Sequence, residues 1–289
     1  MDENTSSQRS HLTRADADDH LINMWLHDRP DGTRREYLRD VDRFRKFLGY
    51  IPLRSLTLED LQSYQTDLNS QDLKDATKRR KLNSIKSLLS FATNLNYTAF
   101  NVAAAVRIPK ASPILAGRFM RVGEVLRLFA REPHQRNVIF LKLLYATGAR
   151  VSEICRLKWS DFRDRDDGEV QVTILGKGQK QRIVLVPIAI WLDLEAMRGD
   201  DAYIFPGRKS GQPITRATGH DIIKAAALRA GLDPNISCHW LRHAHATHSL
   251  AKGAPLQLVR DTLGHSSIAV TNVYLESNPE DSSSKYLGM

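Results

Sequence analysis

Hydrophobic residues recur every three or four positions through the first third of the chain, which is the period of an amphipathic α-helix. The spacing predicts successive helices over residues 16–106, carried by Leu21, Ile22, Trp25, Leu26, Tyr37, Leu38, Val41, Phe44, Phe47, Leu48, Leu58, Leu61 and Leu68. Thr57, with Asp60 three residues later, predicts the N-cap of one of these helices. We therefore expect this region to be a small helical bundle.

A run of basic residues accompanies the last predicted helix of this bundle. The apolar positions of that helix share one face and should be buried; they are Leu82, Ile85, Leu88, Leu89 and Ala92. The basic residues cannot all be buried beside them, so we expect the run to face outward. It consists of Lys78, Arg79, Arg80, Lys81 and Lys86. The bundle should thus carry one basic rim.

A change of composition marks the end of the bundle. Pro109 and Pro113 interrupt helix formation, so we assign residues 107–117 to a linker. Residues 1–15 are polar and are expected to form a mobile arm ahead of the bundle. Residues 118–289 should then make a second domain, as a chain of 289 residues is long for a single core.

The hydrophobic period changes inside the second domain. Helical spacing first predicts helices over residues 123–130, 137–147 and 152–157, the second of them ended by Gly148. Alternation then predicts two strands, one marked by Val170, Val172 and Ile174 and the other by Ile183 and Leu185. Residues 176–180 join them as the basic tip of a β-hairpin. Helical patterns return over residues 215–231, 239–253, 256–263 and 269–274, so the fold class is mainly α with a small β-sheet.

The charge balance favours an anionic partner. The chain has 42 Lys and Arg against 33 Asp and Glu, a net charge of +9, which suits nucleic acid. A hydrophobic content of 42% is typical of a globular protein. No segment reaches the roughly 18 apolar residues that a membrane span needs. The amino end also lacks the basic start and apolar run of a secretory signal.

Cysteine and carboxylate usage exclude some metal sites. Cys155 and Cys238 are too few for a disulfide framework or a thiolate zinc site, so we expect a reducing, cytoplasmic location. The acidic turn at residues 164–169 lacks the alternating ligands of a calcium loop and is expected to be a solvated connection. His239 and His243 have the spacing of a zinc pair. However, Trp240 stands where the zinc motif needs glutamate, so no metal site is predicted.

Several other segments carry groups that are capable of chemistry. Residues 147–150, 176–178 and 263–266 each place a cation or a proton donor beside glycine. Taken singly, each is explained by a surface ion pair or a solvated lysine. His239 and Arg242 lie three residues apart and should share a helix face. Tyr274, considered alone, is a typical core or interface tyrosine.

The order of these residues along the chain is more specific than any of them alone. Arg150 is followed by Glu153, then by Lys177 on the predicted hairpin, and finally by His239, Arg242, His265 and Tyr274. This arrangement resembles the tyrosine recombinase (phage integrase) family, and closely its Xer-type members. The likeness is tightest over residues 146–157 (ATGARVSEICRL), 176–187 (GKGQKQRIVLVP) and 239–274. It implies a SAM-like core-binding domain over residues 16–106. It also implies an α+β tyrosine recombinase catalytic domain over residues 118–289, with a short C-terminal tail helix.

The resemblance implies a covalent reaction on DNA. Tyr274 would attack a DNA phosphate, form a 3′-phosphotyrosyl link and release a 5′-hydroxyl. His239 would help to deprotonate Tyr274, and Lys177 would protonate the leaving oxygen. Because tyrosine is a poor nucleophile at its ordinary pKa of about 10, it needs such a base or a cationic field beside it.

The same resemblance assigns the groups that stabilise charge. Arg150 and Arg242 would hold the two non-bridging oxygens, and His265 would donate a further hydrogen bond. Glu153 would support the site without reacting. Planar guanidinium groups bind such oxygens bidentately, so a site without metal can stabilise a pentacoordinate phosphorus. The covalent ester conserves the energy of the broken strand, so no ATP, metal or other cofactor is implied.

Double-stranded DNA is the implied partner. Phosphate contacts are expected from Arg34, Arg35, Arg43, Lys78, Arg79, Arg80, Lys81 and Lys86, and base contacts from Arg216. Two linked basic domains suit a clamp around the duplex. The resemblance further implies a homotetramer on two DNA sites. The end of the chain, with a capped helix start at residues 278–281 and the apolar Tyr286 and Leu287, is expected to dock on a neighbouring protomer.

Two other functions are compatible with this pattern of residues. A type IB topoisomerase would use the same chemistry to nick and reseal one duplex, and would relax any supercoiled plasmid. A non-catalytic DNA-binding protein would keep the fold but lack one of the six catalytic positions, all of which are filled here. Site-specific recombination is therefore the leading hypothesis, whether it serves integration, excision or dimer resolution.

Overall fold

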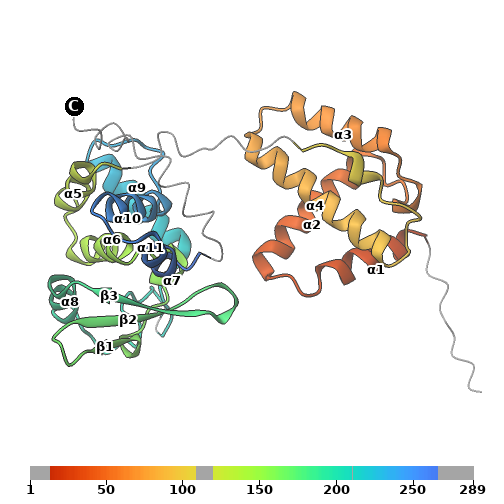
Figure 1. The fold of residues 1–289 in the computed structure, drawn as a ribbon. Coiled ribbons are helices and arrows are strands. Elements are labelled where there is room, and N and C mark those ends of the chain that lie inside the picture. Colours follow the sequence, from red (N-terminus) through yellow and green to blue (C-terminus); the bar gives the residue numbers. More distant parts are fainter. Residues whose placement is uncertain (1–13, 109–119, 210, 266–289) are drawn as a thin grey trace, which may run out of the picture. The chain divides into compact units, whose positions relative to one another are not determined.

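The chain forms two compact units in the computed structural model, residues 1–112 and 113–289, which we name the N-terminal unit and the C-terminal unit (Figure 1). The structure describes residues 14–108, 120–209 and 211–265. Within these ranges it is mainly helical with one small sheet, which confirms the predicted fold class. None of the helices in the described ranges is long and apolar enough to cross a membrane.

The N-terminal unit is a helical bundle, as its hydrophobic period predicts. Its elements are α1 (Arg14–Leu26), α2 (Asp31–Phe47), α3 (Leu58–Ser70) and α4 (Asp75–Asn94), with short 3-10 turns η1 (Leu53–Ser55) and η2 (Val102–Ala105). Residues from all four helices fill the core, among them Leu21, Trp25, Phe44, Tyr64 and Leu88. Thr57 caps α3 as predicted, because its Oγ1 accepts a hydrogen bond from the Asp60 N–H at 3.2 Å.

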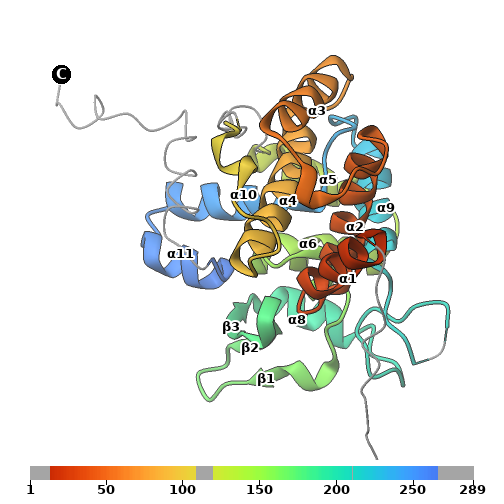
Figure 2. The same cartoon turned by 90° about the vertical axis from the view of Figure 1, so that its right-hand side faces the viewer.

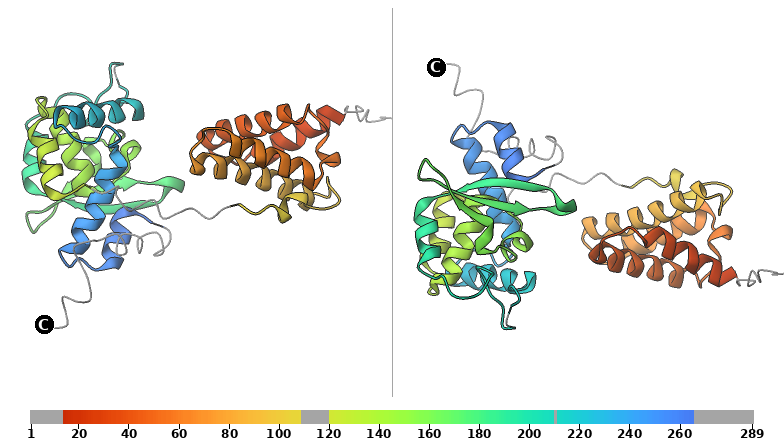
Figure 3. Two further views of the ribbon diagram at one scale, coloured as in Figure 1. Left: turned by 90° about the horizontal axis from the view of Figure 1, so that it is seen from above. Right: turned by 90° about the horizontal axis from the view of Figure 1, so that it is seen from below.

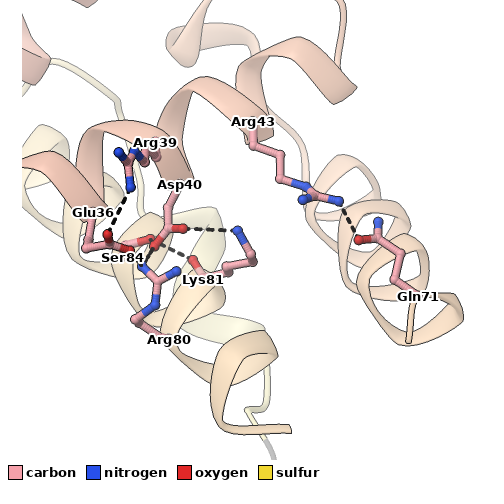
Figure 4. Close-up of polar contacts among 8 residues, drawn as sticks. All are labelled: Glu36, Arg39, Asp40, Arg43, Gln71, Arg80, Lys81 and Ser84. Carbon is pink, nitrogen blue, oxygen red and sulfur yellow. Dashed lines mark hydrogen bonds and ion pairs between the residues drawn. The ribbon is translucent and has the colours of Figure 1, made fainter. Parts of the chain in front are cut away.

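One part of the predicted basic rim is wrong. Lys81 is only 8% exposed, and its Nζ donates to Oδ1 of the buried Asp40 on α2 at 3.1 Å (Figure 4). Lys81 lies four residues before Ile85 and seven before Leu88, which places it on the core face of α4. A charged residue is tolerated there because Asp40 supplies the opposite charge.

The C-terminal unit packs helices over a three-stranded antiparallel sheet (Figures 1 and 2). The helices are α5 (Val122–Ala130), α6 (Gln135–Thr147), α7 (Val151–Ile154), α8 (Ile188–Glu195), α9 (Arg216–Arg229), α10 (Cys238–Ala251) and α11 (Leu256–Leu263). The strands are β1 (Phe162–Asp164), β2 (Val170–Leu175) and β3 (Gln181–Val186), in that spatial order; η3 (Trp159–Asp161) precedes β1, and η4 (Lys177–Gln179) lies between β2 and β3. Helices α6 and α10 contact each other, and α11 lies against α10.

The predicted hairpin is confirmed, but two of the residues that marked it point outward. Val172 pairs with Val184, and both are buried, whereas Ile183 is 61% and Leu185 44% exposed. Residues 183–186 are all apolar, so alternation could not tell the inner face of β3 from the outer one. Figure 3 shows the hairpin extending beyond the helices of its unit. The third strand, β1, was not predicted.

The predicted helix over residues 152–157 is shorter than expected. Helix α7 ends at Ile154, and the carbonyl of Leu157 instead accepts a hydrogen bond from the Ile204 N–H at 3.0 Å. Other helix limits agree with the predictions to within a few residues, including the end of α6 at Gly148. Residues 14 and 15 of the predicted arm belong to α1, so the arm is shorter than predicted. The rest of the arm, most of the linker, the predicted helix over residues 269–274 and the tail with Tyr286 and Leu287 lie outside the described residues.

Candidate active site

The first predicted catalytic arginine lies directly after the turn that ends α6. Gly148 has a positive φ of 58°, and a Cβ there would stand 2.7 Å from side-chain atoms of both His245 and Leu263. Only glycine fits this close approach without strain. Arg150 follows as the N-cap of α7, where its backbone N–H donates to Glu153 Oε2 at 2.9 Å. The turn therefore fixes where the Arg150 side chain begins.

Arg150 and Glu153 also pair through their side chains. Arg150 Nη1 donates to Glu153 Oε1 at 3.0 Å, and the Arg150 side chain remains 42% exposed while that of Glu153 is 6% exposed. Burial alone would raise the pKa of Glu153, but hydrogen bonds from Arg182 and Arg150 hold it below its usual value. Glu153 is therefore an ionised support for an arginine that can still reach a ligand.

The second predicted arginine, Arg242, is buried in the framework of the site. It is 1% exposed, and its Nη1 donates to the Gly148 carbonyl at 2.6 Å. Its Nη2 donates to the Leu263 carbonyl at 2.7 Å. Those carbonyls belong to the segments that carry Arg150 and His265. One guanidinium on α10 thus brings together two distant segments that carry predicted catalytic residues.

The predicted catalytic histidines have lowered pKa values, which favour their neutral forms. Desolvation, followed by the charges of Arg242 and Arg150, lowers the pKa of His239, which lies at the surface near the start of α10. Desolvation and then Arg242, Arg150, His239 and Arg182 lower the pKa of the partly buried His265 to about 4. Neutral imidazoles can accept a proton or donate a hydrogen bond. The geometry groups these residues, because Arg242 lies three residues after His239 on α10 and binds the carbonyls two residues before Arg150 and two residues before His265.

His239 and His243, which have the spacing of a zinc pair, contact each other through their rings. The rings of His239 and His243 pack edge to face with centroids 4.1 Å apart. Within the described ranges, no group of three or more His, Cys, Asp or Glu side chains is placed to hold a metal ion.

Two predicted catalytic residues are described partly or not at all. The backbone of Lys177 lies at the tip of the β2–β3 hairpin, where η4 contains Gly178 and Gln179 with positive φ angles of 73° and 62°. Tyr274 lies outside the described residues. The structure therefore brings together Arg150, His239, Arg242 and His265, with Glu153 beneath Arg150.

One residue of this site, Arg182, was not predicted from the sequence. Arg182 on β3 donates from Nη2 to Glu153 Oε2 at 2.6 Å and from Nε to the Thr262 carbonyl at 2.8 Å. Its side chain is only 10% exposed. Alternation contains the signal that could have found it, because Arg182 has the same parity as the buried Val184 and Val186. A charged residue at such a position requires a buried partner.

The predicted DNA contacts on α2 and α9 lie at the surface. Arg34 and Arg35 are exposed, and the exposed Arg43 donates to Gln71 (Figure 4). Arg216 is the exposed first residue of α9, and its Nε donates to His220 Nε2 at 3.3 Å. Each of these four cations is placed where an anion can approach.

Most of the predicted DNA-contacting residues on α4 make hydrogen bonds or ion pairs within the protein. Lys78 Nζ donates to the Asn69 carbonyl at 3.2 Å, and Lys86 Nζ donates to the Val106 carbonyl at 2.6 Å. Arg80 pairs with both Asp40 and Glu36, and Arg79 is half-buried. Together with the buried Lys81, these bonds mean that α4 presents less free positive charge than its sequence suggests.

Comparison with known proteins assigns each unit to a protein family. The profile of the Phage integrase family matches residues 118–281, and that of the Phage integrase, N-terminal SAM-like domain matches residues 26–95. The chain is 33% identical over 264 residues to the tyrosine recombinase XerD of Rickettsia conorii, covering 82% of this chain and 86% of that protein. The chain therefore belongs to the phage integrase family.

Two solved structures share its fold at lower sequence identity. One is a lambda integrase tetramer bound to a Holliday junction, with a TM-score of 0.73 and 18% identity, covering 91% of this chain and 77% of that one. The other is the XerH site-specific recombinase bound to its difH substrate, with a TM-score of 0.66 and 22% identity, covering 82% and 73%. These likenesses confirm the predicted combination of a SAM-like helical domain with a recombinase catalytic fold.

Proposed function

We propose that this protein is a site-specific DNA recombinase of the Xer type, an enzyme that cleaves and rejoins DNA strands through a 3′-phosphotyrosine intermediate. The observation that carries the proposal is the convergence of Arg150, His239, Arg242 and His265, which come from three separated segments and are joined through the Gly148 and Leu263 carbonyls. Family membership and the similarity to XerD of Rickettsia conorii support the same activity.

The chemistry proceeds by exchange of one phosphodiester for another. The phenolic oxygen of Tyr274 attacks the DNA phosphorus, the bond from phosphorus to the 5′-oxygen breaks, and a 3′-phosphotyrosyl ester forms. His239 takes the phenolic proton, since its lowered pKa favours the neutral form that can accept one. Lys177 gives a proton to the leaving 5′-oxygen. Attack by a 5′-hydroxyl from a partner strand reverses these steps and reseals the DNA.

Charge stabilisation falls to the two arginines and His265. The non-bridging oxygens gain negative charge as phosphorus becomes pentacoordinate, and fixed guanidinium donors stabilise that charge without reorganising. Arg150 is the partly exposed member of the pair, whereas Arg242 is held by two main-chain carbonyls. His265 donates one further hydrogen bond as a neutral imidazole. The chain's own residues therefore supply every group that this mechanism uses.

The proposed partners follow from the relatives. Lambda integrase binds a Holliday junction as a tetramer, and XerH binds its difH substrate. We propose that this chain likewise forms a homotetramer on two DNA sites. Both units contact the duplex, and the tail near Tyr286 and Leu287 docks on a neighbouring protomer. The free thiols of Cys155 and Cys238 suit a reducing compartment, so we assign the protein to the cytoplasm.

A covalent trapping experiment tests the proposed function. Purified full-length protein is incubated with nicked duplexes that contain a randomised core, and adducts that survive detergent are captured and sequenced. We expect one short sequence to be enriched, and we expect Tyr274→Phe to abolish the adduct while DNA binding persists. Tyr203→Phe is the matched control, because Tyr203 packs against Lys158 away from the site.

Three outcomes would contradict the proposal. Adduct formation by Tyr274→Phe would place the nucleophile elsewhere. Adducts without sequence preference, together with relaxation of any supercoiled plasmid, would indicate a topoisomerase. Sequence-specific binding without any adduct would indicate a non-catalytic DNA-binding protein.

A further inference from the structure

We propose that Arg182 is a positioning residue for the strand-transfer reaction. It fixes the positions of Arg150 and His265 relative to each other and to the Lys177 hairpin. The inference rests on the proposed function. Arg182 lies on the inner face of β3, and the two acceptors that it binds belong to two other elements, α7 and the end of α11.

The guanidinium shape makes this link specific. Nε and Nη2 lie on the same edge of the planar group, so their hydrogens point in parallel. Nη2 binds Glu153 Oε2 and Nε binds the Thr262 carbonyl, so one rigid edge sets the separation of those two oxygens. A lysine in its place has a single nitrogen and no fixed plane. It can neutralise Glu153 without controlling Thr262.

The link acts on His265 through the end of α11. The last carbonyls of a helix lack partners within the helix and carry partial negative charge. Here Arg182 binds the Thr262 carbonyl and Arg242 binds the next one, Leu263. Gly264 follows with a φ of 65°, and a Cβ there would lie 3.3 Å from Arg182 Cδ. The Arg182 side chain thus passes directly beneath the turn that delivers His265.

The link acts on Arg150 through Glu153. The same carboxylate that receives Arg182 also receives the Arg150 side chain and the Arg150 N–H. If Arg182 is lost, the buried Glu153 loses its better-shielded partner and depends on the exposed Arg150 alone. Arg150 is then drawn toward neutralising Glu153 instead of facing the DNA phosphate.

The third connection is to the base of the hairpin. A Cβ on Gly176 would lie 3.5 Å from both Arg182 Nη1 and Glu153 Oε1, so the strand end before Lys177 packs closely on the ion pair. Arg182 follows Lys177 by five residues on the same hairpin. The orientation of the Lys177 loop is therefore coupled to the same buried contact that holds Arg150 and His265.

The test separates positioning from binding and from folding. Full-length wild type, Arg182→Lys and Arg182→Gln are compared for DNA affinity, thermal unfolding and the single-turnover rate of adduct formation at saturating DNA. The control is Arg165→Gln, which removes an arginine from an exposed pair with Asp167 (Nη2 to Oδ2, 2.7 Å) in the same sheet region. Arg182→Lys is the decisive variant, because it keeps a charge beside Glu153 and so preserves folding.

We expect Arg182→Lys to bind DNA within about twofold of wild type but to form the adduct about 10- to 100-fold more slowly, the size of effect typical of a misplaced catalytic group. Arg182→Gln should be at least as slow, and Arg165→Gln should match wild type. The NMR titration of His265 supplies a readout that loss of stability alone does not move. Its pKa should rise in Arg182→Gln, because a neighbouring positive charge that lowers it has been removed, and should rise less in Arg182→Lys.

Two results would overturn the inference. One is an Arg182→Lys adduct rate equal to that of wild type, and the other is a His265 pKa in Arg182→Gln that does not move. Failure of the proposed function is distinguishable from both, because in that case wild-type protein itself forms no adduct at Tyr274.

Discussion

Each unit of the molecule buries one carboxylate with two basic partners, and the two clusters have different consequences. In the N-terminal unit, Asp40 is 1% exposed and binds Arg80 and Lys81 (Figure 4). In the C-terminal unit, Glu153 is 6% exposed and binds Arg150 and Arg182. The same kind of ion cluster therefore occurs in a helical core and in a proposed active site.

The two clusters differ in whether a basic partner of the carboxylate also contacts a third element. Arg80 and Lys81 are neighbours on α4, so the Asp40 cluster joins α2 to α4 and ends there. Arg182 continues from Glu153 to the Thr262 carbonyl, so the Glu153 cluster joins α7, β3 and the end of α11. We conclude that a buried ion pair contributes to core packing or to catalytic geometry according to whether its cation contacts a further element.

The largest expected effect comes from removing the carboxylate of the core cluster. Asp40→Ala leaves Lys81 buried without its counter-charge, which typically costs about 3–5 kcal/mol in the free energy of unfolding. Hydrogen exchange should show faster exchange throughout α2 and α4 and no change in α6 or α10. Asp42→Ala is the control, as Asp42 is exposed on the same helix. A change below about 1 kcal/mol for Asp40→Ala would mean that the cluster is not stabilising.

Next in size is the effect of neutralising the carboxylate of the site cluster. Glu153→Gln keeps the side-chain shape but removes the charge that orients Arg150 and Arg182, so the adduct rate should fall about 100-fold. DNA affinity should change little, because Arg150 remains a cation. The matched control is Glu195→Gln, whose carboxylate pairs with the nearby Arg198 away from the site. An unchanged adduct rate would show that Glu153, like Asp40, contributes only to the packing of the core.

A smaller effect concerns the pH response of the C-terminal unit. The pKa of His265 is lowered from 6.5 to about 4 on folding, so between these values the unfolded chain binds more protons than the folded chain. Stability should therefore fall as pH decreases from 6.5 toward 4, by roughly 1–2 kcal/mol at pH 5 from this group.

An NMR titration checks this assignment directly. The imidazole of His265 should remain neutral at pH 6 and titrate near pH 4 in the free protein. Addition of DNA should raise its pKa, since a phosphate beside the ring favours the charged form. A free-protein midpoint near 6.5 would show that His265 is neither buried nor surrounded by the arginines.

The smallest effect is expected from a lysine that sequence alone assigns to DNA. Lys81→Met should leave DNA affinity within about twofold of wild type and leave its salt dependence unchanged, because Lys81 is buried against Asp40. Arg34→Ala removes an exposed cation and should reduce the slope of log affinity against log salt by about 1. Equal effects of the two variants would show that Lys81 leaves Asp40 to contact DNA.

The sequence could predict those features that depend on local pattern. Apolar spacing predicted the hairpin and most of the described helices, although not α8 (Ile188–Glu195). Thr57 with Asp60 predicted a cap, and Gly148 predicted the end of α6. The order of motifs also predicted that Arg150, Arg242, His239 and His265 come together, through their resemblance to a family whose membership is now shown.

Features that depend on a partner from elsewhere in the chain could not be predicted in this way. Lys81 faces inward because Asp40, 41 residues earlier, is there to neutralise it. Arg182 faces inward because Glu153 and the Thr262 carbonyl meet it. The inner face of β3 was ambiguous because residues on both faces are apolar. Each case needed knowledge of which segments pack together.

The most direct test of the central claim is to identify the residue that carries the DNA. Trapped adduct is digested with nuclease and protease, and the modified peptide is sequenced by mass spectrometry. The account predicts a nucleotide joined through its 3′-phosphate to the phenolic oxygen of Tyr274, with a free 5′-hydroxyl on the other DNA end. A nucleotide on any other residue, or a link through a 5′-phosphate, would contradict it.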